Sequence, residues 1–297
     1  KSAKGGTWEL TLYEKTGIGN GNQANNPWLQ ELPDPISKVT WDNYITMNPG
    51  DMKEKGFNTL ERYNQLDMQA DMAKVTANGI TLELPVYPQP GQSKGTIGIA
   101  LGYGRTKTGT CGNNVGQNVY PFLQVAGGSL QYIATNVEVS DKTGNTYQLA
   151  CTQTHHTMMG RAIVKETDLE TYINKPKEHW NEQEMIHTSK GKLPHNQVNL
   201  WADHEKPGHR WGLSIDLNSC IGCAACLVSC SAENNVAVVG KEEIRKSREM
   251  HWIRIDRYYS SDMTEKKAEE GKVGTIDMYL GMENPTEDNP KVVFQPI

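Results

Sequence analysis

The sequence predicts a mixed, β-rich protein in two parts, and three observations support this. In the first half, short alternating apolar runs are separated by Gly, Asn and Pro, a pattern typical of a β-barrel or sandwich. The 28 glycines fit that class, because they gather where strands would turn. After Trp211 the pattern changes, and four of the six cysteines follow within residues 220–230.

The strands of the first half are expected from their alternation and from the turns between them. The first strand is expected over 8–13. Asn78 and Gly79 predict a two-residue hairpin turn between strands over 74–76 and 80–87. Further strands are expected over 95–101, 119–123, 131–134, 137–139 and 146–150.

Three loop-rich stretches interrupt these strands. The glycines of 17–22 could suggest a phosphate loop, but the lysine and the strand-to-helix setting are missing, so a turn is expected. Residues 25–35 predict an extended strap without helix, because of their prolines. A short helix is expected over 52–57, ended by Gly56.

A connector separates the two halves. An amphipathic helix is expected over 165–173, and three prolines then interrupt a polar tract. The composition therefore predicts a first domain over 1–175, a connector over 176–210 and a second domain over 211–297. In the second domain, strands are expected over 213–217, 250–259, 276–280 and 291–294, with an exposed helix or loop over 241–249.

The cysteines of the second domain follow the spacing C-x2-C-x2-C-x3-C. With this spacing, Cys220, Cys223 and Cys226 can wrap around one cubic iron–sulfur cluster and present three thiolates to three irons. The fourth cysteine of such a run ligates another cluster in two-cluster ferredoxins. We therefore expect Cys220, Cys223 and Cys226 to bind one 4Fe–4S cluster and Cys230 to bind a second.

The residues between the cysteines suit such a site. Gly222, Ala224 and Ala225 are small, so backbone N–H groups can approach the sulfurs and raise the reduction potential. A zinc site usually takes two C-x2-C pairs about a dozen or more residues apart, and disulfides cannot easily use four cysteines so close together. The apolar residues expected to shield the cluster from water are Ile221, Leu227 and Val228.

The ligand set is incomplete within this sequence. Cys111 and Cys151 stand alone and cannot form a second run. We therefore expect the chain to be an internal segment of a longer protein, with further cysteine runs after Ile297 that supply the remaining ligands.

A second polar group includes Cys151, His155 and His156. A metal site there would need further ligands, and none is apparent in the sequence, so structural packing is the preferred interpretation. Cys111 is interpreted in the same way, as a small buried hydrophobic residue. No catalytic residue is assigned.

Charge and hydropathy exclude two classes of partner. The net charge of -5 and the 22% of charged residues include no dense Lys/Arg face, so nucleic acid is not expected. No apolar stretch approaches the roughly 18 residues needed to span a bilayer. Any membrane association is therefore expected to go through partner subunits.

The second half resembles the four-cluster iron–sulfur subunits of membrane-bound respiratory oxidoreductases. Simple ferredoxins usually place proline after the fourth cysteine, whereas Ser231 stands there in this sequence. The run 230–236, followed by 248–259, is similar to the first cluster motif of those subunits.

The first half resembles the C-terminal, dinucleotide-cofactor-contacting barrel of the molybdopterin oxidoreductases. Its fusion upstream of a cluster domain is similar to the B subunits of bacterial alternative complex III, a quinol-oxidising respiratory complex. The stretches that carry this likeness are 26–36, 89–98 and 152–161. The resemblance implies a six-stranded β-barrel followed by the first part of an α+β ferredoxin-like domain.

The resemblance also implies a function. The chain would be a non-catalytic electron-transfer subunit that relays electrons from quinol toward cytochrome c or a terminal oxidase, at the periplasmic face of the bacterial inner membrane. No molybdenum is expected, and the family allows a 3Fe–4S cluster elsewhere in the full protein. The implied partners are polytopic quinol-oxidising membrane subunits, multihaem and monohaem cytochrome c subunits and a haem–copper oxidase.

Two other functions stay open at this point. In one, the barrel holds a pterin and the clusters serve an active molybdopterin oxidoreductase, although such enzymes usually carry the two parts on separate chains. In the other, the cysteines bind zinc and the barrel docks partner proteins.

Overall fold

The computed structural model divides into two compact units. The first unit combines Lys1–Met159 with Leu217–Ile297, and the second is Gly160–Asp216. The structure describes residues 8–60, 69–153, 155–158, 161–263, 265–270, 282 and 284–297.

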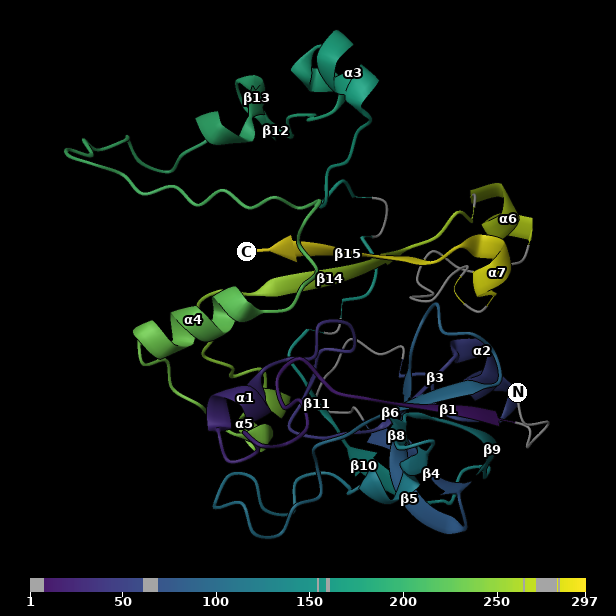
Figure 1. Ribbon diagram of the computed structural model, residues 1–297. Coiled ribbons are helices and arrows are strands. Elements are labelled where there is room, and N and C mark those ends of the chain that lie inside the picture. Colours follow the sequence, from purple (N-terminus) through teal and green to yellow (C-terminus); the bar gives the residue numbers. More distant parts are fainter. Residues whose placement is uncertain are drawn as a thin grey trace. The chain divides into compact units, whose positions relative to one another are not determined.

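Six strands of the first unit form a closed β-barrel, which confirms the predicted β-rich class (Figure 1). The strands are β1 (Trp8–Tyr13), β3 (Ile45–Met47), β4 (Gln69–Ala77), β5 (Ile80–Pro88), β6 (Thr96–Ala100) and β9 (Ile133–Val139). They pair in the order β4-β5-β3-β6-β1-β9, and β9 pairs again with β4, so the sheet closes on itself. Strand β10 (Thr146–Gln148) extends the sheet from β4.

The barrel interior is apolar because alternate residues of each strand point inward. The hairpin between β4 and β5 forms as predicted, since Asn78 and Gly79 adopt φ of 54° and 77°. The largest fully buried apolar side chains of the barrel core are Leu10, Ile45, Met47, Met52, Leu84, Ile97, Ile99 and Phe122.

The expected extended strap contains a helix, so that prediction is wrong. Helix α1 (Pro27–Glu31) begins with proline at its first position, where the missing N–H is not needed. The Asn26 Oδ1 atom accepts hydrogen bonds from the backbone N–H groups of Trp28 and Leu29, at 3.0 and 3.3 Å. The Asn-Pro pair therefore starts a helix here.

A second Asn-Pro pair, Asn48 and Pro49, sets the start of the next helix. Helix α2 (Pro49–Glu54) starts earlier than predicted, because Asn48 Oδ1 caps it through the N–H of Gly50 at 2.7 Å. It ends near Gly56, as expected, where φ is 73°. The strand predicted over 119–123 is wrong, since residues Tyr120–Phe122 form the 3₁₀ helix η2 around a proline.

Short strand pairs complete the first part of this unit. Strand β2 (Val39–Thr40) pairs with β11 (Ala150–Cys151), and β7 (Gln124–Ala126) pairs with β8 (Ser129–Gln131). Residues 131–134 and 137–139, expected as separate strands, contribute mainly to the single strand β9.

The C-terminal part of the first unit is built from short helices and one two-stranded sheet. Strands β14 (Ile255–Ser260) and β15 (Lys291–Pro296) pair in antiparallel fashion. The strand predicted over 213–217 is wrong, because the segment is irregular. Leu213 is 78% exposed, so the alternating apolar side chains do not form a buried face. The strand expected over 276–280 lies outside the described residues. The helices are α4 (Ala225–Glu233), α5 (Lys241–Arg245), α6 (Glu265–Glu270) and α7 (Pro285–Asp288).

The second unit is small. Its helix α3 (Leu169–Asn174) starts later than predicted, because Asp168 caps it through the N–H of Thr171 at 2.7 Å. Within the residues that the structure describes, no helix combines the length and apolar character that a bilayer crossing requires. The other elements of this unit are η3 (Lys177–His179), η4 (His195–Gln197) and the hairpin of β12 (Met185–Thr188) and β13 (Gly191–Pro194).

Candidate functional site

The four clustered cysteines occupy one loop and the helix that follows it. Cys220 and Cys223 lie in the loop, whereas Cys226 and Cys230 lie one turn apart on α4. All four are free thiols; Cys226 is exposed and the other three are partly buried. The Nδ2 atom of Asn234 lies 3.6 Å from the Cys230 sulfur. The loop therefore holds several accessible thiols close together in sequence.

The cysteine loop curls through two left-handed residues. Gly222 has φ of 68°, and a Cβ added there would lie 2.4 Å from the Phe294 ring of β15. Ala224 has φ of 61°, a conformation that costs a non-glycine residue about 1–2 kcal/mol. Small residues at these two positions thus permit the curl and the close approach of β15.

The loop and α4 pack against the barrel half of the chain. One buried apolar cluster contains Leu32 beside α1, Ala224 and Leu227 of the cysteine segment, and Ile255 of β14. Leu227 therefore does not face water. In contrast, Ile221 is 73% exposed, so its shielding of a cluster stays a prediction.

The donor atoms suit an iron–sulfur cluster by their chemistry. Soft thiolate ligands select iron–sulfur clusters, copper(I) or zinc. Among the described residues, no three His, Cys, Asp or Glu side chains gather closely enough to hold a single metal ion. A four-iron cluster binds each thiolate to a different iron, so its ligands stand farther apart than those of one ion.

A buried carboxylate joins α1 to the segment after α4. Glu31 is 1% exposed and accepts hydrogen bonds from the backbone N–H groups of Val239 and Gly240, at 3.1 and 2.7 Å. The indole Nε1 of Trp41 donates to the same carboxylate at 3.3 Å. Because Gly240 precedes α5, the negative charge also lies at the start of that helix, where it is favourable.

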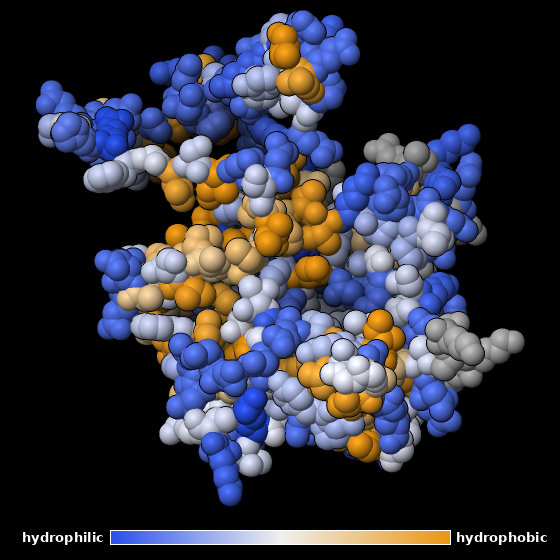
Figure 2. Space-filling model, in the orientation of Figure 1, coloured by the Kyte–Doolittle hydropathy of each residue, from blue (hydrophilic) through white to orange (hydrophobic). Residues whose placement is uncertain are grey.

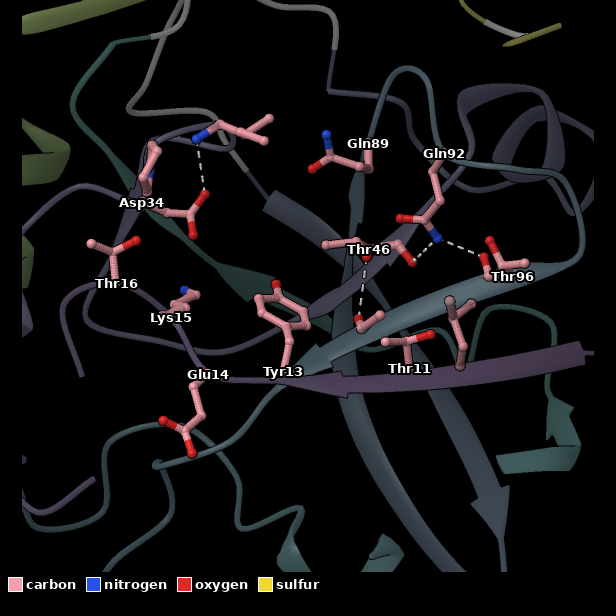
Figure 3. A pocket seen from close by; sticks show the side chains of 14 residues that line it. Thr11, Tyr13, Glu14, Lys15, Thr16, Asp34, Thr46, Gln89, Gln92 and Thr96 are labelled. Atoms are coloured by element: carbon pink, nitrogen blue, oxygen red, sulfur yellow. Dashed lines mark hydrogen bonds between the residues drawn. The ribbon is translucent and has the colours of Figure 1, made fainter. Parts of the chain in front are cut away.

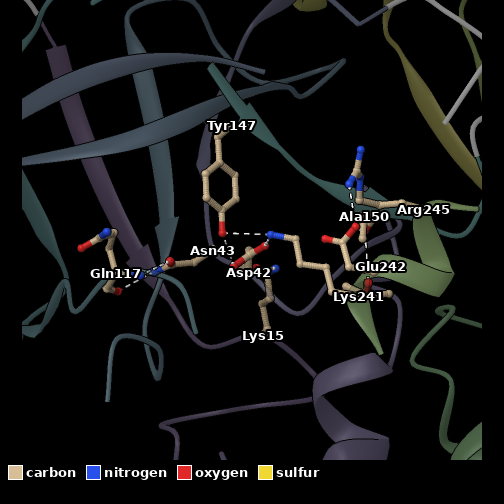
Figure 4. A network of polar contacts seen from close by, with 10 residues as sticks. Lys15, Asp42, Asn43, Gln117, Tyr147, Ala150, Lys241, Glu242 and Arg245 are labelled. Atoms are coloured by element: carbon tan, nitrogen blue, oxygen red, sulfur yellow. Dashed lines mark hydrogen bonds and ion pairs between the residues drawn. The ribbon is translucent and has the colours of Figure 1, made fainter. Parts of the chain in front are cut away.

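A second buried carboxylate, Asp42, forms an ion pair with Lys241 of α5 (Figure 4). The Tyr147 hydroxyl donates to Asp42 Oδ1 at 3.0 Å and accepts from Lys241 Nζ at 2.9 Å. Burial alone would lower the pKa of Lys241, but the Asp42 carboxylate and the Tyr147 hydroxyl together outweigh it and the pKa is raised. The Lys15 ammonium donates to the Asp42 carbonyl at 2.7 Å, so two lysines converge on this residue.

Arg257 of β14 is fully buried against the barrel half. Its Nε donates to the Ile36 carbonyl at 2.5 Å, and its Nη1 donates to Nδ1 of His156. Burial, followed by the Arg257 charge, holds the pKa of His156 well below its ordinary value. The backbone carbonyl of His156 accepts from the Tyr259 N–H at 2.7 Å. His156 is therefore a neutral packing residue, whereas His155 is exposed.

The two isolated cysteines differ from each other. Cys151 is fully buried in an apolar cluster, as expected, and burial raises the pKa of its thiol to about 12. Cys111 is only partly buried, so its interpretation as a buried hydrophobic residue is wrong. It lies in a turn, where its backbone N–H donates to Asn25 Oδ1 at 3.1 Å. The position of Cys111 is therefore set by this turn and not by packing in an apolar core.

One side of the barrel carries a polar cavity of about 450 Å³ (Figure 3). Tyr13, Asp34 and Gln89 line it, together with the buried Lys15. The Gln92 amide bridges the carbonyls of two barrel residues, Thr46 and Thr96, at 3.0 and 2.6 Å. The sequence contained no signal for this cavity, because its lining comes from four separate segments.

Apolar surface gathers over α4 and the sheet of β14 and β15 (Figure 2). Around the cysteine loop, Ile221, Trp252 and Ile297 are 73%, 66% and 61% exposed. Clustered apolar exposure of this kind commonly marks a surface that contacts another protein.

The fold and the cysteine loop define a chain that joins a closed β-barrel to a thiol-rich segment. No protein family model matches the chain. A stretch of 44 residues is 43% identical to the iron–sulfur cluster-binding subunit of menaquinone reductase from Nitratidesulfovibrio vulgaris. That stretch is 15% of this chain and covers 17% of the subunit's length.

The sequence did not reveal the charged residues that tie the barrel half to the cysteine segment. Glu31, Asp42 and Arg257 are all buried, yet their sequence surroundings resemble those of ordinary surface charges. A buried charge is recognised only once its partners are known, and each of these three residues has a partner more than a hundred residues away.

Proposed function

We propose that this chain is an iron–sulfur electron-transfer subunit of a membrane-bound respiratory quinone oxidoreductase. The observation that carries the proposal is the run of free thiols at Cys220, Cys223, Cys226 and Cys230 on one curled loop and its helix. Thiolates in this spacing are typical ligands of 4Fe–4S clusters. The likeness to an iron–sulfur subunit of menaquinone reductase supports the same class.

Each cysteine has a proposed role. Cys220, Cys223 and Cys226 would hold one 4Fe–4S cluster, and Cys230 would ligate a second cluster whose other ligands lie outside this sequence. The bound clusters supply one-electron transfer. The chain itself contributes thiolate ligands, the curled backbone at Gly222 and Ala224, and the apolar packing of Leu227 behind the loop.

The specific complex that we propose is bacterial alternative complex III. The chain would be the B-type subunit, with a barrel over 1–175, a connector over 176–210 and the first part of a ferredoxin-type domain over 211–297. It would lie on the periplasmic side of the inner membrane and pass electrons from quinol toward cytochrome c or a terminal oxidase. The apolar surface around Trp252 and Ile297 supports contact with partner subunits. Those partners would be polytopic quinol-oxidising subunits, cytochrome c subunits and a haem–copper oxidase.

Metal analysis of the full-length chain in its intact complex tests this proposal. We expect iron and acid-labile sulfide in amounts that match several clusters, with no molybdenum. A purified complex in which this chain carries neither iron nor sulfide would contradict it, and zinc in their place would favour a structural module.

A second candidate is the electron-transfer part of an active molybdopterin oxidoreductase. The polar cavity on the barrel, with Tyr13, Asp34 and Gln89 in its wall, is the observation that favours it. Stoichiometric molybdenum in the same analysis would move the catalytic site to the barrel half.

A further inference from the structure

A second cavity, of about 300 Å³, lies where the barrel half meets the cysteine segment. It is bounded on the barrel side by residues that follow α1 and by Thr152 after β11, and on the other side by the cysteine loop and β14. The residues that matter here are Pro33, Lys38 and Thr152 on the first side, and Ala224, Leu227 and Ile255 on the second.

Lys38 places a buried ammonium in this cavity wall. The residue is 3% exposed, and its Nζ donates to the Ile255 carbonyl at 2.6 Å. Ile255 belongs to the apolar cluster that also contains Ala224 and Leu227 of the cysteine segment. Among the described residues, Lys38 forms no ion pair with a carboxylate. Its charge is therefore held by a carbonyl, close to the base of the cysteine loop.

Lys38 carries a positive charge at neutral pH despite its burial. Burial, followed by Arg257, lowers the pKa of Lys38 to about 8, and Asp34, Asp256 and Cys220 oppose this. A pKa of about 8 leaves the ammonium charged at neutral pH. Lys38 therefore presents this charge in the wall of the cavity that Ala224, between Cys223 and Cys226, also lines.

The backbone of Lys38 holds it in an unfavourable conformation. Its φ is 63°, a left-handed value that Gly or Asn adopts with less strain. The N–H of Lys38 donates to the Asp34 carbonyl at 3.0 Å, and its carbonyl accepts from the Thr152 N–H at 3.1 Å. The backbone is therefore fixed on both sides of Lys38, and this position carries a long cation where a smaller residue would fit the backbone better.

We propose that Lys38, a residue of the barrel half, raises the reduction potential of the cluster held by Cys220, Cys223 and Cys226. The inference rests on the proposed function. Uptake of one electron, supplied by the quinol-oxidising partner, adds one negative charge and neither forms nor breaks a bond in this chain. A fixed cation nearby stabilises the reduced form more than the oxidised form. The barrel would then tune electron transfer in addition to supporting the fold.

Redox titration followed by electron paramagnetic resonance tests this in the full-length chain within its intact complex. Lys38→Gln removes the charge but keeps an N–H donor for the Ile255 carbonyl, and Lys38→Arg keeps the charge. Lys94→Gln is the matched control, because Lys94 is an exposed barrel lysine. For Lys38→Gln we expect reduction of one cluster to become roughly tenfold less favourable, a negative shift of about 59 mV for a one-electron couple. Lys38→Arg and Lys94→Gln should leave every midpoint near the wild-type value.

The outcomes separate the two proposals. Unchanged midpoints in Lys38→Gln, with full iron and sulfide content, would overturn the role of Lys38 and leave the electron-transfer function standing. Absence of iron and sulfide from the wild-type chain would instead overturn the function itself. If Lys38→Gln does not assemble, Lys38→Met, which keeps the apolar stem, is titrated in its place. The same negative shift of the midpoint potential would then support the role of Lys38, and an unchanged midpoint would overturn it.

Discussion

The Asp42 carboxylate lies 2.5 Å from the Lys241 ammonium, and this ion pair connects the loop between β2 and β3 to helix α5 of the cysteine segment. Asp42 is buried, whereas the Lys241 side chain is 25% exposed. Tyr147 of β10 contacts both groups. One polar cluster therefore links three parts of the chain that are distant in sequence.

Asp42→Asn should destabilise the first unit. The substitution removes the counter-charge of Lys241, and loss of one partner from a buried pair costs about 3 kcal/mol, reduced here by the partial exposure of Lys241. Denaturant unfolding of the full chain, followed by tryptophan fluorescence, measures the change. Glu242→Gln is the control, because Glu242 is 70% exposed in its pair with Arg245 and should cost less than about 1 kcal/mol. Equal losses in the two variants would contradict the special role of Asp42.

Glu31→Gln should loosen the segment that precedes α5. The carboxylate accepts three N–H groups from Val239, Gly240 and Trp41, whereas an amide offers only one acceptor oxygen. At least one buried donor loses its partner, at a cost of about 1–3 kcal/mol. Hydrogen exchange at Val239 and Gly240 should accelerate, while exchange within the barrel strands stays unchanged. Identical protection of Val239 and Gly240 in Glu31→Gln would show that these hydrogen bonds do not stabilise the segment before α5.

Gly222→Ala should distort the cysteine loop. The new Cβ would meet the Phe294 ring at 2.4 Å and would occupy a left-handed backbone position. Overpacking and backbone strain together predict a loss of about 1–3 kcal/mol and a reduced iron content.

Gly127→Ala provides the matched control for this change. Gly127 has φ of 60°, but nothing lies within 4 Å of an added Cβ. Gly127→Ala therefore measures the cost of the left-handed backbone conformation without the cost of a clash with a neighbouring side chain. Gly222→Ala combined with Phe294→Leu should recover part of the loss, and no recovery would argue against the contact with Phe294.

Cysteine substitutions should separate the two proposed clusters. Cys220→Ser should remove or convert one cluster signal in electron paramagnetic resonance, and Cys230→Ser should affect a different one, because the two thiols are proposed to serve different clusters. Cys111→Ser is the control and should leave all signals intact. If Cys230→Ser leaves every signal unchanged, the assignment of Cys230 to a second cluster is wrong.

The buried Lys15 should make stability depend on pH in the alkaline range. Burial lowers its pKa from 10.5 to about 8, so above pH 8 the unfolded chain binds the proton more tightly than the folded one. Stability then rises with pH for this group. From pH 8 to 9, the free energy of unfolding of the wild type should rise relative to Lys15→Met by about 1 kcal/mol.

Denaturant unfolding at the two pH values checks this difference. Lys94→Met serves as the control, because an exposed lysine should give a curve parallel to the wild type. Parallel curves for wild type and Lys15→Met would show that Lys15 keeps its ordinary pKa in the folded chain.

The sequence by itself determined the features that depend on local pattern. Alternating runs predict β1, β6 and most of β9, and Asn78-Gly79 predicts the hairpin turn because both residues tolerate positive φ. The β-rich class follows from these runs. The spacing of Cys220 to Cys230 predicts a thiol-rich site, because ligand spacing is a property of neighbouring residues.

Tertiary structure decided what depends on distant partners. The pairing of β9 with β4 closes the barrel, and residues 213–217 alternate in the sequence yet form no strand. The burial of Asp42, Arg257 and Lys38 likewise required the folded chain. The physical reason is that turns and ligand runs depend on a few adjacent dihedral angles, whereas sheet closure and buried charges depend on groups that come together only when the chain folds.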